Sequence, residues 1–197
     1  MALGAPIAFF RQTLGAFRTT GAIAPSSGFL ARAIVAQLPA HGEMPEDFRV
    51  LEVGPGTGPF TEAIARRMDG RGHLDLYEIN AEFVRLMRGR IEREKAFARM
   101  RERIRIHAGD VLRLPARPAY DAIVSGLPFN NFTPEEVQGF LAHFRALLKD
   151  GGTLSFFEYC AIRRLQAPFV GRERRLRLEG IARVVTAEIG VATYVGI

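Results

Sequence analysis

The chain of 197 residues is long enough for one α/β domain with a short extension, and its 48% apolar and 24% charged residues are typical of globular proteins. No apolar run approaches the length of a membrane-spanning helix, and a single cysteine, Cys160, excludes an internal disulfide and a cysteine-rich metal site. The formal charge of +6 and the pI near 10.2 favour a polyanionic partner, either nucleic acid or a membrane rich in anionic lipid.

Residues 1–20 predict an amphipathic helix. Apolar side chains recur there at helical spacing and form one stripe of Leu3, Ile7, Phe10, Leu14 and Phe17. Arg11 and Arg18 fall beside this stripe, where cations lie on a helix in a membrane interface. Packing of the stripe on the chain's own domain is the alternative. Because no basic residue precedes the apolar start, we expect no secretory signal and a cytoplasmic protein.

A second helix is predicted after residues 25–27, which offer an N-terminal cap. We expect its buried face to comprise Phe29, Leu30, Ala33, Ile34 and Leu38. A polar connector with Gly42 and Pro45 follows. The sequence therefore predicts a helical extension over residues 1–47 and a domain over residues 48–197.

From residue 48 onward, strand and helix patterns alternate. We expect strands at 49–53, 74–77, 104–107, 120–125 and 153–159, and helices at 60–68, 81–101 and 134–148. Segments 181–188 and 191–195, on either side of Gly190, predict a terminal strand pair. Such alternation indicates a doubly wound, mostly parallel sheet with helices on both faces and ligand at the carboxyl ends of the strands.

Arginines gather in two places outside the predicted strands. Between residues 85 and 105 acidic residues are interleaved at helical spacing, which favours a solvated helix face. The second group is opposed only by Glu173 and favours contact with a polyanion; it comprises Arg163, Arg164, Arg172, Arg174, Arg175 and Arg177.

A glycine-rich loop follows the first predicted strand, with the sequence Glu52-Val53-Gly54-Pro55-Gly56-Thr57-Gly58. Its glycines let the backbone approach a ligand closely, and the N–H groups of the next helix face that ligand. The glycine pattern alone does not identify the ligand, because nicotinamide and flavin enzymes use similar loops.

Three carboxylates at the ends of consecutive strands favour S-adenosylmethionine (SAM) as the ligand. Glu52 would repel a pyrophosphate but suits the cationic amine of the methionine part. Glu78 can accept hydrogen bonds from both ribose hydroxyls, and Asp110 can accept one from the adenine amino group. For Glu52 or Asp110 singly, capping of a helix is the alternative. Their neighbours in the predicted site are Ile79, Gly109 and Val111.

This constellation resembles the class I SAM-dependent methyltransferases over nearly the whole of residues 48–158. The resemblance implies a Rossmann-like fold with a seven-stranded, mostly parallel sheet that ends in an antiparallel strand. It also implies that Thr57 and the loop glycines bind the methionine part, Glu78 the ribose and Asp110 the adenine. S-adenosylhomocysteine would be the product, and no metal is implied.

The predicted acceptor loop follows the fourth strand and reads Ser125-Gly126-Leu127-Pro128-Phe129. We expect Ser125, Gly126 and Leu127 to lie beside the reacting atoms, with Ser125 also at the cofactor. The rRNA adenine dimethylases resemble this chain in residues 24–28 and in a Leu-Pro-aromatic loop, but their loop begins with Asn or a related polar residue. Gly126 cannot supply that side chain, which holds the amino group of a flipped adenine.

The bacterial phospholipid N-methyltransferases of the soluble, SAM-dependent type resemble the chain almost end to end, including Phe157-Glu158-Tyr159. This resemblance implies methylation of phosphatidylethanolamine toward phosphatidylcholine by a monomer bound peripherally to the cytoplasmic membrane, with no nucleic acid partner. Residues expected at the membrane are Ile7, Phe10, Arg11, Leu14, Phe17 and Arg18.

The chemistry of a lipid amine indicates which side chains would contact the headgroup. Aromatic faces at Phe129, Phe132 and Tyr159 would favour the methylated, cationic nitrogen. Tyr159 is also a candidate catalytic residue through its hydroxyl, and Arg163 and Arg164 would hold the lipid phosphate. Packing of Tyr159 at the rim and general membrane attraction of the arginines are the alternatives.

Two other functions are compatible with the motifs: an rRNA adenine N6-methyltransferase, and a SAM-binding protein on membranes without catalysis. Among the histidines, His107 lies at a strand end, where a structural role is favoured over proton transfer. His143 lies in a predicted helix, where we expect a structural role.

Overall fold

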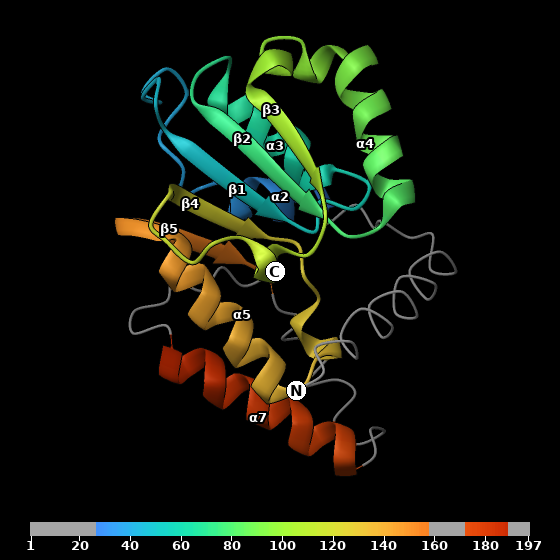
Figure 1. The fold of residues 1–197 in the computed structure, drawn as a ribbon, viewed down its shortest axis with the longest axis vertical. Helices are drawn as coiled ribbons and strands as arrows, with labels where there is room; N and C mark the ends of the chain where they lie inside the picture. Colours follow the sequence, from blue (N-terminus) through green and yellow to red (C-terminus); the bar gives the residue numbers. More distant parts are fainter. Residues whose placement is uncertain (1–26, 158–171, 189–197) are drawn as a thin grey trace.

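The computed structural model describes residues 27–157 and 172–188 (Figure 1). Within them the sheet has five strands in the order β3-β2-β1-β4-β5, and every neighbouring pair is parallel. The strands are β1 (Arg49–Val53), β2 (His73–Glu78), β3 (Ile104–Ala108), β4 (Tyr120–Ser125) and β5 (Leu148–Phe156). The strand order reverses between β1 and β4, which is where open α/β sheets bind ligands. The predicted Rossmann-like class is confirmed.

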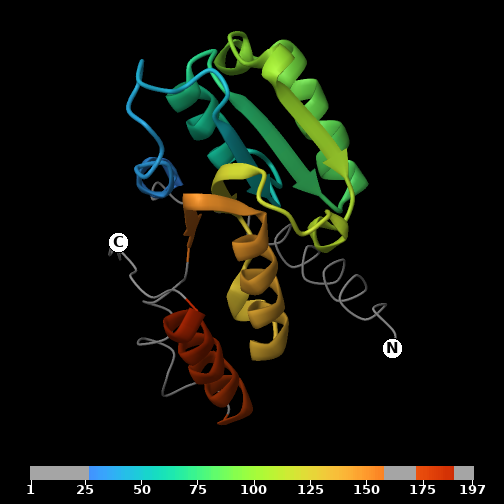
Figure 2. The same cartoon turned by 60° about the vertical axis from the view of Figure 1, so that its left-hand side comes forward.

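Helices cover both faces of this sheet (Figures 1 and 2). One face packs against α2 (Ser27–Ile34), α3 (Pro59–Met68) and α4 (Ala81–Arg93), and the other against α5 (Pro134–Leu147). Helix α7 (Arg172–Glu188) packs on α5. Because side chains alternate along a strand, Val50 packs in the first core and Leu51 in the second. None of the helices in the described ranges combines the length and apolar character that a membrane span requires.

Helix α2 belongs to the extension predicted over residues 1–47, and it packs in the same core as α3. Ile34 and Leu38 are buried, as predicted for the buried face of this helix. Phe29 is exposed, so its assignment to that face is wrong. The helix ends at Ile34, and its buried positions are Ala31 and Ile34, which are spaced one turn apart. Residues 1–26, with the predicted amphipathic helix, lie outside the described part of the chain.

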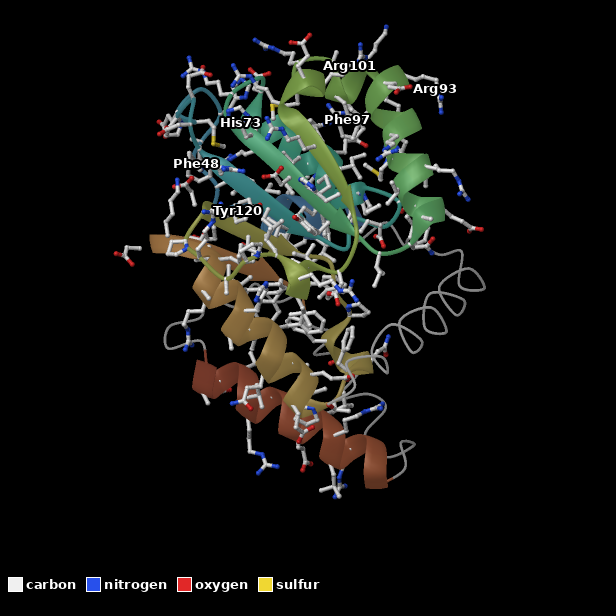
Figure 3. All side chains as sticks on the ribbon, viewed as in Figure 1. Phe48, His73, Arg93, Phe97, Arg101 and Tyr120 are labelled. Carbon is white, nitrogen blue, oxygen red and sulfur yellow. The ribbon has the colours of Figure 1, made fainter. Side chains whose placement is uncertain are left out.

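The long helix predicted over residues 81–101 is wrong in its second half, because α4 ends at Arg93. The backbone leaves the helix at Glu94 and continues through two short 3₁₀ segments, η1 (Lys95–Phe97) and η2 (Arg101–Arg103). This turn buries Phe97 completely at the end of α4 (Figure 3), and Arg101 donates a hydrogen bond back to the carbonyl oxygen of Ile91 at 3.1 Å. Burial of the aromatic ring therefore outweighs continuation of the helix.

The strand predicted over residues 181–188 is also wrong, since these residues form the second half of α7. Ile181 and Val185 are buried against α5, while Arg183 between them is exposed. A strand would place all three side chains on one face, whereas a helix turns Arg183 away. The partner segment 191–195 lies outside the described residues. Of the seven strands implied by the resemblance, the described ranges therefore contain five, all of them parallel.

The last described strand, β5, begins earlier than predicted. It starts at Leu148 instead of residue 153, with a register shift opposite Tyr120 and Ala122 that accommodates the turn at Gly151. The remaining boundaries of β1 to β4, α3 and α5 agree with the prediction to within one residue at each end.

A polar network lies across β1 to β4 on the side of the sheet that also carries Leu51. Asp75 is buried and accepts hydrogen bonds from Arg49 at 2.8 Å and from the Tyr120 hydroxyl at 3.2 Å, while His107 Nε2 lies 3.0 Å from its other oxygen. Burial alone would raise the pKa of Asp75, but the bonds with His107 and Arg49 outweigh it and lower the pKa. His107 also stacks on Tyr77, which supports the structural role favoured for it.

Candidate cofactor and acceptor site

The glycine loop begins where β1 ends and leads into α3. Gly54, Gly56 and Gly58 all have positive φ angles, of 69°, 56° and 89°. Residues with a Cβ rarely adopt this backbone region, so the loop shape requires these glycines. The Gly54 N–H donates to the carbonyl oxygen of Tyr77 at 2.9 Å, which ties the loop to β2.

Glu78, the last residue of β2, lies beneath the loop. Its carboxylate accepts hydrogen bonds from the N–H groups of Gly56 at 3.1 Å and Asn80 at 2.8 Å. Burial raises the pKa of Glu78, and the backbone N–H groups of Asn80, Gly56 and Ile79 partly oppose that rise. Each carboxylate oxygen of Glu78 thus accepts one backbone hydrogen bond. Each can accept another from the side of the hollow, where a ribose hydroxyl would donate it.

Asp110 follows β3 and caps the 3₁₀ segment η3 (Val111–Arg113) by accepting from the Leu112 N–H at 3.0 Å. Asp110 therefore does cap a helix, which was the alternative to a role in adenine binding. It also borders the hollow. His143 on α5 fixes the same segment, because its Nε2 lies 2.9 Å from the carbonyl oxygen of Val111. This contact gives His143 the structural role expected of it.

Glu52 is completely buried one layer below the loop. Neither of its carboxylate oxygens, nor the Thr61 hydroxyl, has a hydrogen-bond partner among the described residues. Burial raises the pKa of Glu52 to about 8, and the nearby Glu78 carboxylate adds to this rise. A buried acceptor without a donor is costly, so the site has unused capacity for a cation or donor supplied by a ligand.

These elements border a hollow that is open to solvent. Its polar border comes from Glu78, Asp110 and the loop backbone. Among the described residues, the lining is Val53, Gly54, Tyr77, Glu78, Ile79, Gly109, Asp110, Val111, Leu112, Leu127, Phe132 and Phe140. Tyr77, Leu112 and Phe140 were not predicted. The place of Tyr77 directly before Glu78 at a strand end is a signal that could have identified it, whereas Phe140 has only the ordinary apolar spacing of a helix.

The acceptor loop runs beside the glycine loop and shares its backbone contacts. Gly126 donates its N–H to the carbonyl oxygen of Val53 at 2.8 Å, and Ser125 Oγ accepts from the Leu127 N–H at 3.3 Å. Leu127 borders the hollow, while Ser125 is fully buried at the end of β4. The three residues predicted beside the reacting atoms are thus brought together with the cofactor loop.

The aromatic residues predicted for the acceptor pocket separate in the structure. Phe132 borders the hollow, with its ring 5.3 Å from that of Phe140. Phe129 is buried in the core against Phe140 and Phe156, and the lining formed by described residues does not include it. Tyr159, Arg163 and Arg164 lie outside the described ranges, so their predicted contacts with substrate stay predictions.

Gly126 is required by its approach to the cofactor loop. A Cβ atom at this position would lie 2.5 Å from the carbonyl oxygen of Gly54. We therefore expect Gly126→Ala to displace the glycine loop and weaken SAM binding about tenfold, as measured by isothermal titration calorimetry. Gly139→Ala is the control: its methyl group would meet no atom within 4 Å, and on a helix it should raise the melting temperature. Equal SAM affinity in both variants would contradict the expectation.

Comparison with known proteins agrees with this geometry. Residues 50–152 match the family described as "Methyltransferase domain". Ornithine lipid N-methyltransferase of Singulisphaera acidiphila is 31% identical over 68% of this chain and 67% of its own length. Ribosomal RNA small subunit methyltransferase A of Pseudomonas syringae is 33% identical over 46% of this chain, which spans only 31% of that relative.

Solved structures share the fold. A SAM-dependent O-methyltransferase from Thermotoga maritima superposes with a TM-score of 0.54 at 18% identity, over 84% of this chain and 51% of that chain. The glycopeptide N-methyltransferase MtfA, complexed with SAM, gives a TM-score of 0.51 at 22% identity, over 67% and 54% of the two chains. This chain therefore spans about half the length of these two structures.

The chain belongs to the methyltransferase domain family, because the match covers more than half of its length. It is a SAM-dependent methyltransferase of the class I fold. The site fits that cofactor: Glu78 and Asp110 offer acceptors at the border of the hollow, and Glu52 offers buried acceptor capacity below the loop. SAM, when bound, supplies an electrophilic methyl group on a sulfonium.

Proposed function

We propose that this enzyme methylates the primary amine of a lipid headgroup, phosphatidylethanolamine in particular, toward phosphatidylcholine at a membrane surface. The observation that carries the proposal is the acceptor loop. Gly126 provides no side chain, and its contact with Gly54 leaves no room for one. An adenine acceptor would lose the polar anchor expected at this position, so an rRNA adenine N6-methyltransferase is the weaker candidate.

One relative supports the same choice. The ornithine lipid N-methyltransferase, whose printed name refers to the methylation of a lipid, aligns over more of this chain than the ribosomal RNA methyltransferase does. Ornithine lipid and phosphatidylethanolamine both carry a primary amine, so the shared chemistry is the transfer of a methyl group to a lipid nitrogen. Phosphatidylethanolamine is our choice because the resemblance of this chain to phospholipid N-methyltransferases extends to Tyr159, beyond the acceptor loop.

The described residues suit such an acceptor in two ways. Leu127, Phe132 and Phe140 give the hollow an apolar and aromatic border, which favours a nitrogen that becomes a methylated cation. The reacting nitrogen needs a free lone pair and an approach near 3 Å to the methyl carbon, so its proton must leave before each transfer. The acceptor loop, fixed by the bonds of Gly126 and Ser125, positions the headgroup for that approach.

Membrane attachment is the second part of the proposal. Residues 7–18 would insert their apolar stripe, and Arg163 and Arg164 would hold the lipid phosphate on the cytoplasmic side. In the described part of the basic segment, Arg175 and Leu176 lie exposed next to each other at the start of α7. An exposed cation beside an exposed apolar side chain supports contact with an anionic lipid surface.

The deciding experiment offers the purified chain radiolabelled SAM with three acceptors in parallel: vesicles with phosphatidylethanolamine, vesicles with ornithine lipid, and ribosomal RNA. We expect label in the phosphatidylethanolamine fraction. Label in ornithine lipid alone would correct the headgroup, and label in RNA alone would overturn the lipid proposal. Binding of SAM without transfer to any acceptor would support a non-catalytic role.

The predicted amphipathic helix allows a separate test of membrane attachment. We expect the combined substitution of Ile7, Phe10 and Phe17 by Ser to reduce vesicle binding at least about tenfold in a flotation assay, while SAM affinity stays unchanged. Substitution of Ala5 and Ala16 by Ser on the opposite face of the predicted helix is the control. An equal fall in SAM affinity would mean that the helix covers the cofactor site instead.

A further inference from the structure

One arginine on α4 contacts the cofactor loop from outside the hollow. The side chain of Arg90 is only 20% exposed, although it belongs to the stretch of alternating charges expected to form a solvated helix face. Its Nη1 donates a hydrogen bond to the carbonyl oxygen of Thr57. Thr57 lies between Gly56 and Gly58, so this bond reaches the centre of the glycine loop.

The same guanidinium is held by two carboxylates. Nε and Nη2 donate to the two oxygens of Glu94 at 2.7 and 2.6 Å, and Nη2 also donates to Glu62 at 3.2 Å. The guanidinium carbon lies 5.6 Å from the ring centroid of Phe97, which is buried at the end of α4 (Figure 3). All three nitrogens are therefore engaged, and the planar group has a fixed orientation toward Thr57.

The packing around Gly58 shows how closely α4 approaches the loop. A Cβ atom at Gly58 would lie 2.8 Å from Arg90 Nη1 and 2.5 Å from Met87 Sδ. On the other side, the loop is held by the bonds of Gly54 with Tyr77 and of Gly56 with Glu78. Without Arg90, the Thr57 carbonyl would lose the hydrogen bond that holds this side of the loop.

We propose that Arg90 is a positioning residue for the cofactor: through Thr57 it holds the glycine loop in the shape that binds SAM. It does not border the hollow formed by the described residues, so it acts on the methionine subsite only through the loop. Because it concerns the methyl donor, this role is the same whichever acceptor the enzyme takes.

Arg90→Met tests the proposal, because methionine keeps much of the side-chain volume and removes every donor. We expect SAM affinity, measured by calorimetry, to fall about tenfold, as for the loss of a charged hydrogen bond. Hydrogen exchange of the ligand-free protein should become faster in the peptide that contains residues 54–60. The matched control is Arg66→Met, which removes another ion pair of Glu62, at 2.9 Å, without contact to the loop.

A second variant separates positioning from general stability. Glu94→Gln removes the ion pair with Arg90 but keeps the donor to Thr57, so we expect a lower melting temperature with SAM affinity within about twofold of the parent. A fall in SAM affinity for Arg90→Met alone, together with faster exchange of the loop, would support the role of Arg90. Unchanged SAM affinity in a folded Arg90→Met protein, or an equal loss in Arg66→Met, would overturn it.

Discussion

Glu78→Ala is expected to weaken SAM binding at least about a hundredfold, so that calorimetry at ordinary protein concentrations detects no binding. The substitution removes the acceptor proposed for the ribose hydroxyls. It also removes the acceptor of the Gly56 N–H, so that the Gly54 bond to Tyr77 is left to tie the loop to β2. Two losses at one site explain why this is the largest effect we expect.

Glu92→Ala is the matched control for Glu78→Ala, since Glu92 is exposed on α4. We expect unchanged SAM affinity in this variant. Circular dichroism and the melting temperature establish that the Glu78→Ala protein is folded. Retention of parental affinity by the folded variant would mean that the ribose assignment of Glu78 is wrong.

Glu52→Gln is expected to change stability in a pH-dependent way. The pKa of Glu52 is about 8 in the folded protein and near 4.5 in the unfolded chain. Between these values the folded state binds more protons, so the Glu52 contribution to stability falls as pH rises through this window. Glutamine mimics the neutral acid, so the variant should match the parent near pH 4.5 and exceed it by roughly 3 to 5 kcal/mol near pH 8.5.

Denaturant unfolding of both proteins at several pH values measures this difference. The same substitution removes the carboxylate that can balance the cationic amine, so SAM affinity should fall although stability rises. A stability difference that does not vary with pH would contradict the buried, neutral state of Glu52. Unchanged SAM affinity would mean that the amine is bound elsewhere.

The residues of the cofactor site could be predicted because their signals are local in sequence. Gly54, Gly56 and Gly58 follow β1 directly, Glu78 is the last residue of β2, and Asp110 lies two residues beyond the end of β3. In a parallel sheet the carboxyl ends of strands meet at one edge, so sequence position at a strand end determines position in space. The acceptor loop was found for the same reason.

Other features depended on contacts between distant residues. The solvated face expected between residues 85 and 105 includes Arg90, whose partner Thr57 lies 33 residues away. The helix expected to continue to residue 101 is interrupted because Phe97 is buried beneath it. The position of Phe129 in the acceptor loop suggests a ligand pocket, but its ring is buried in the core against Phe156. No local pattern distinguishes these outcomes.

By itself the sequence determined the order of strands and helices from β1 to β5, the glycine loop and the carboxylates around it, because each follows from periodicity or from a residue at a strand end. Only the tertiary structure decided which charges are buried, where α4 ends, that residues 181–188 are helical, and that Gly126 lies against Gly54. Those outcomes depend on close packing between segments far apart in the chain, and packing competes with local preference wherever a large side chain can be buried.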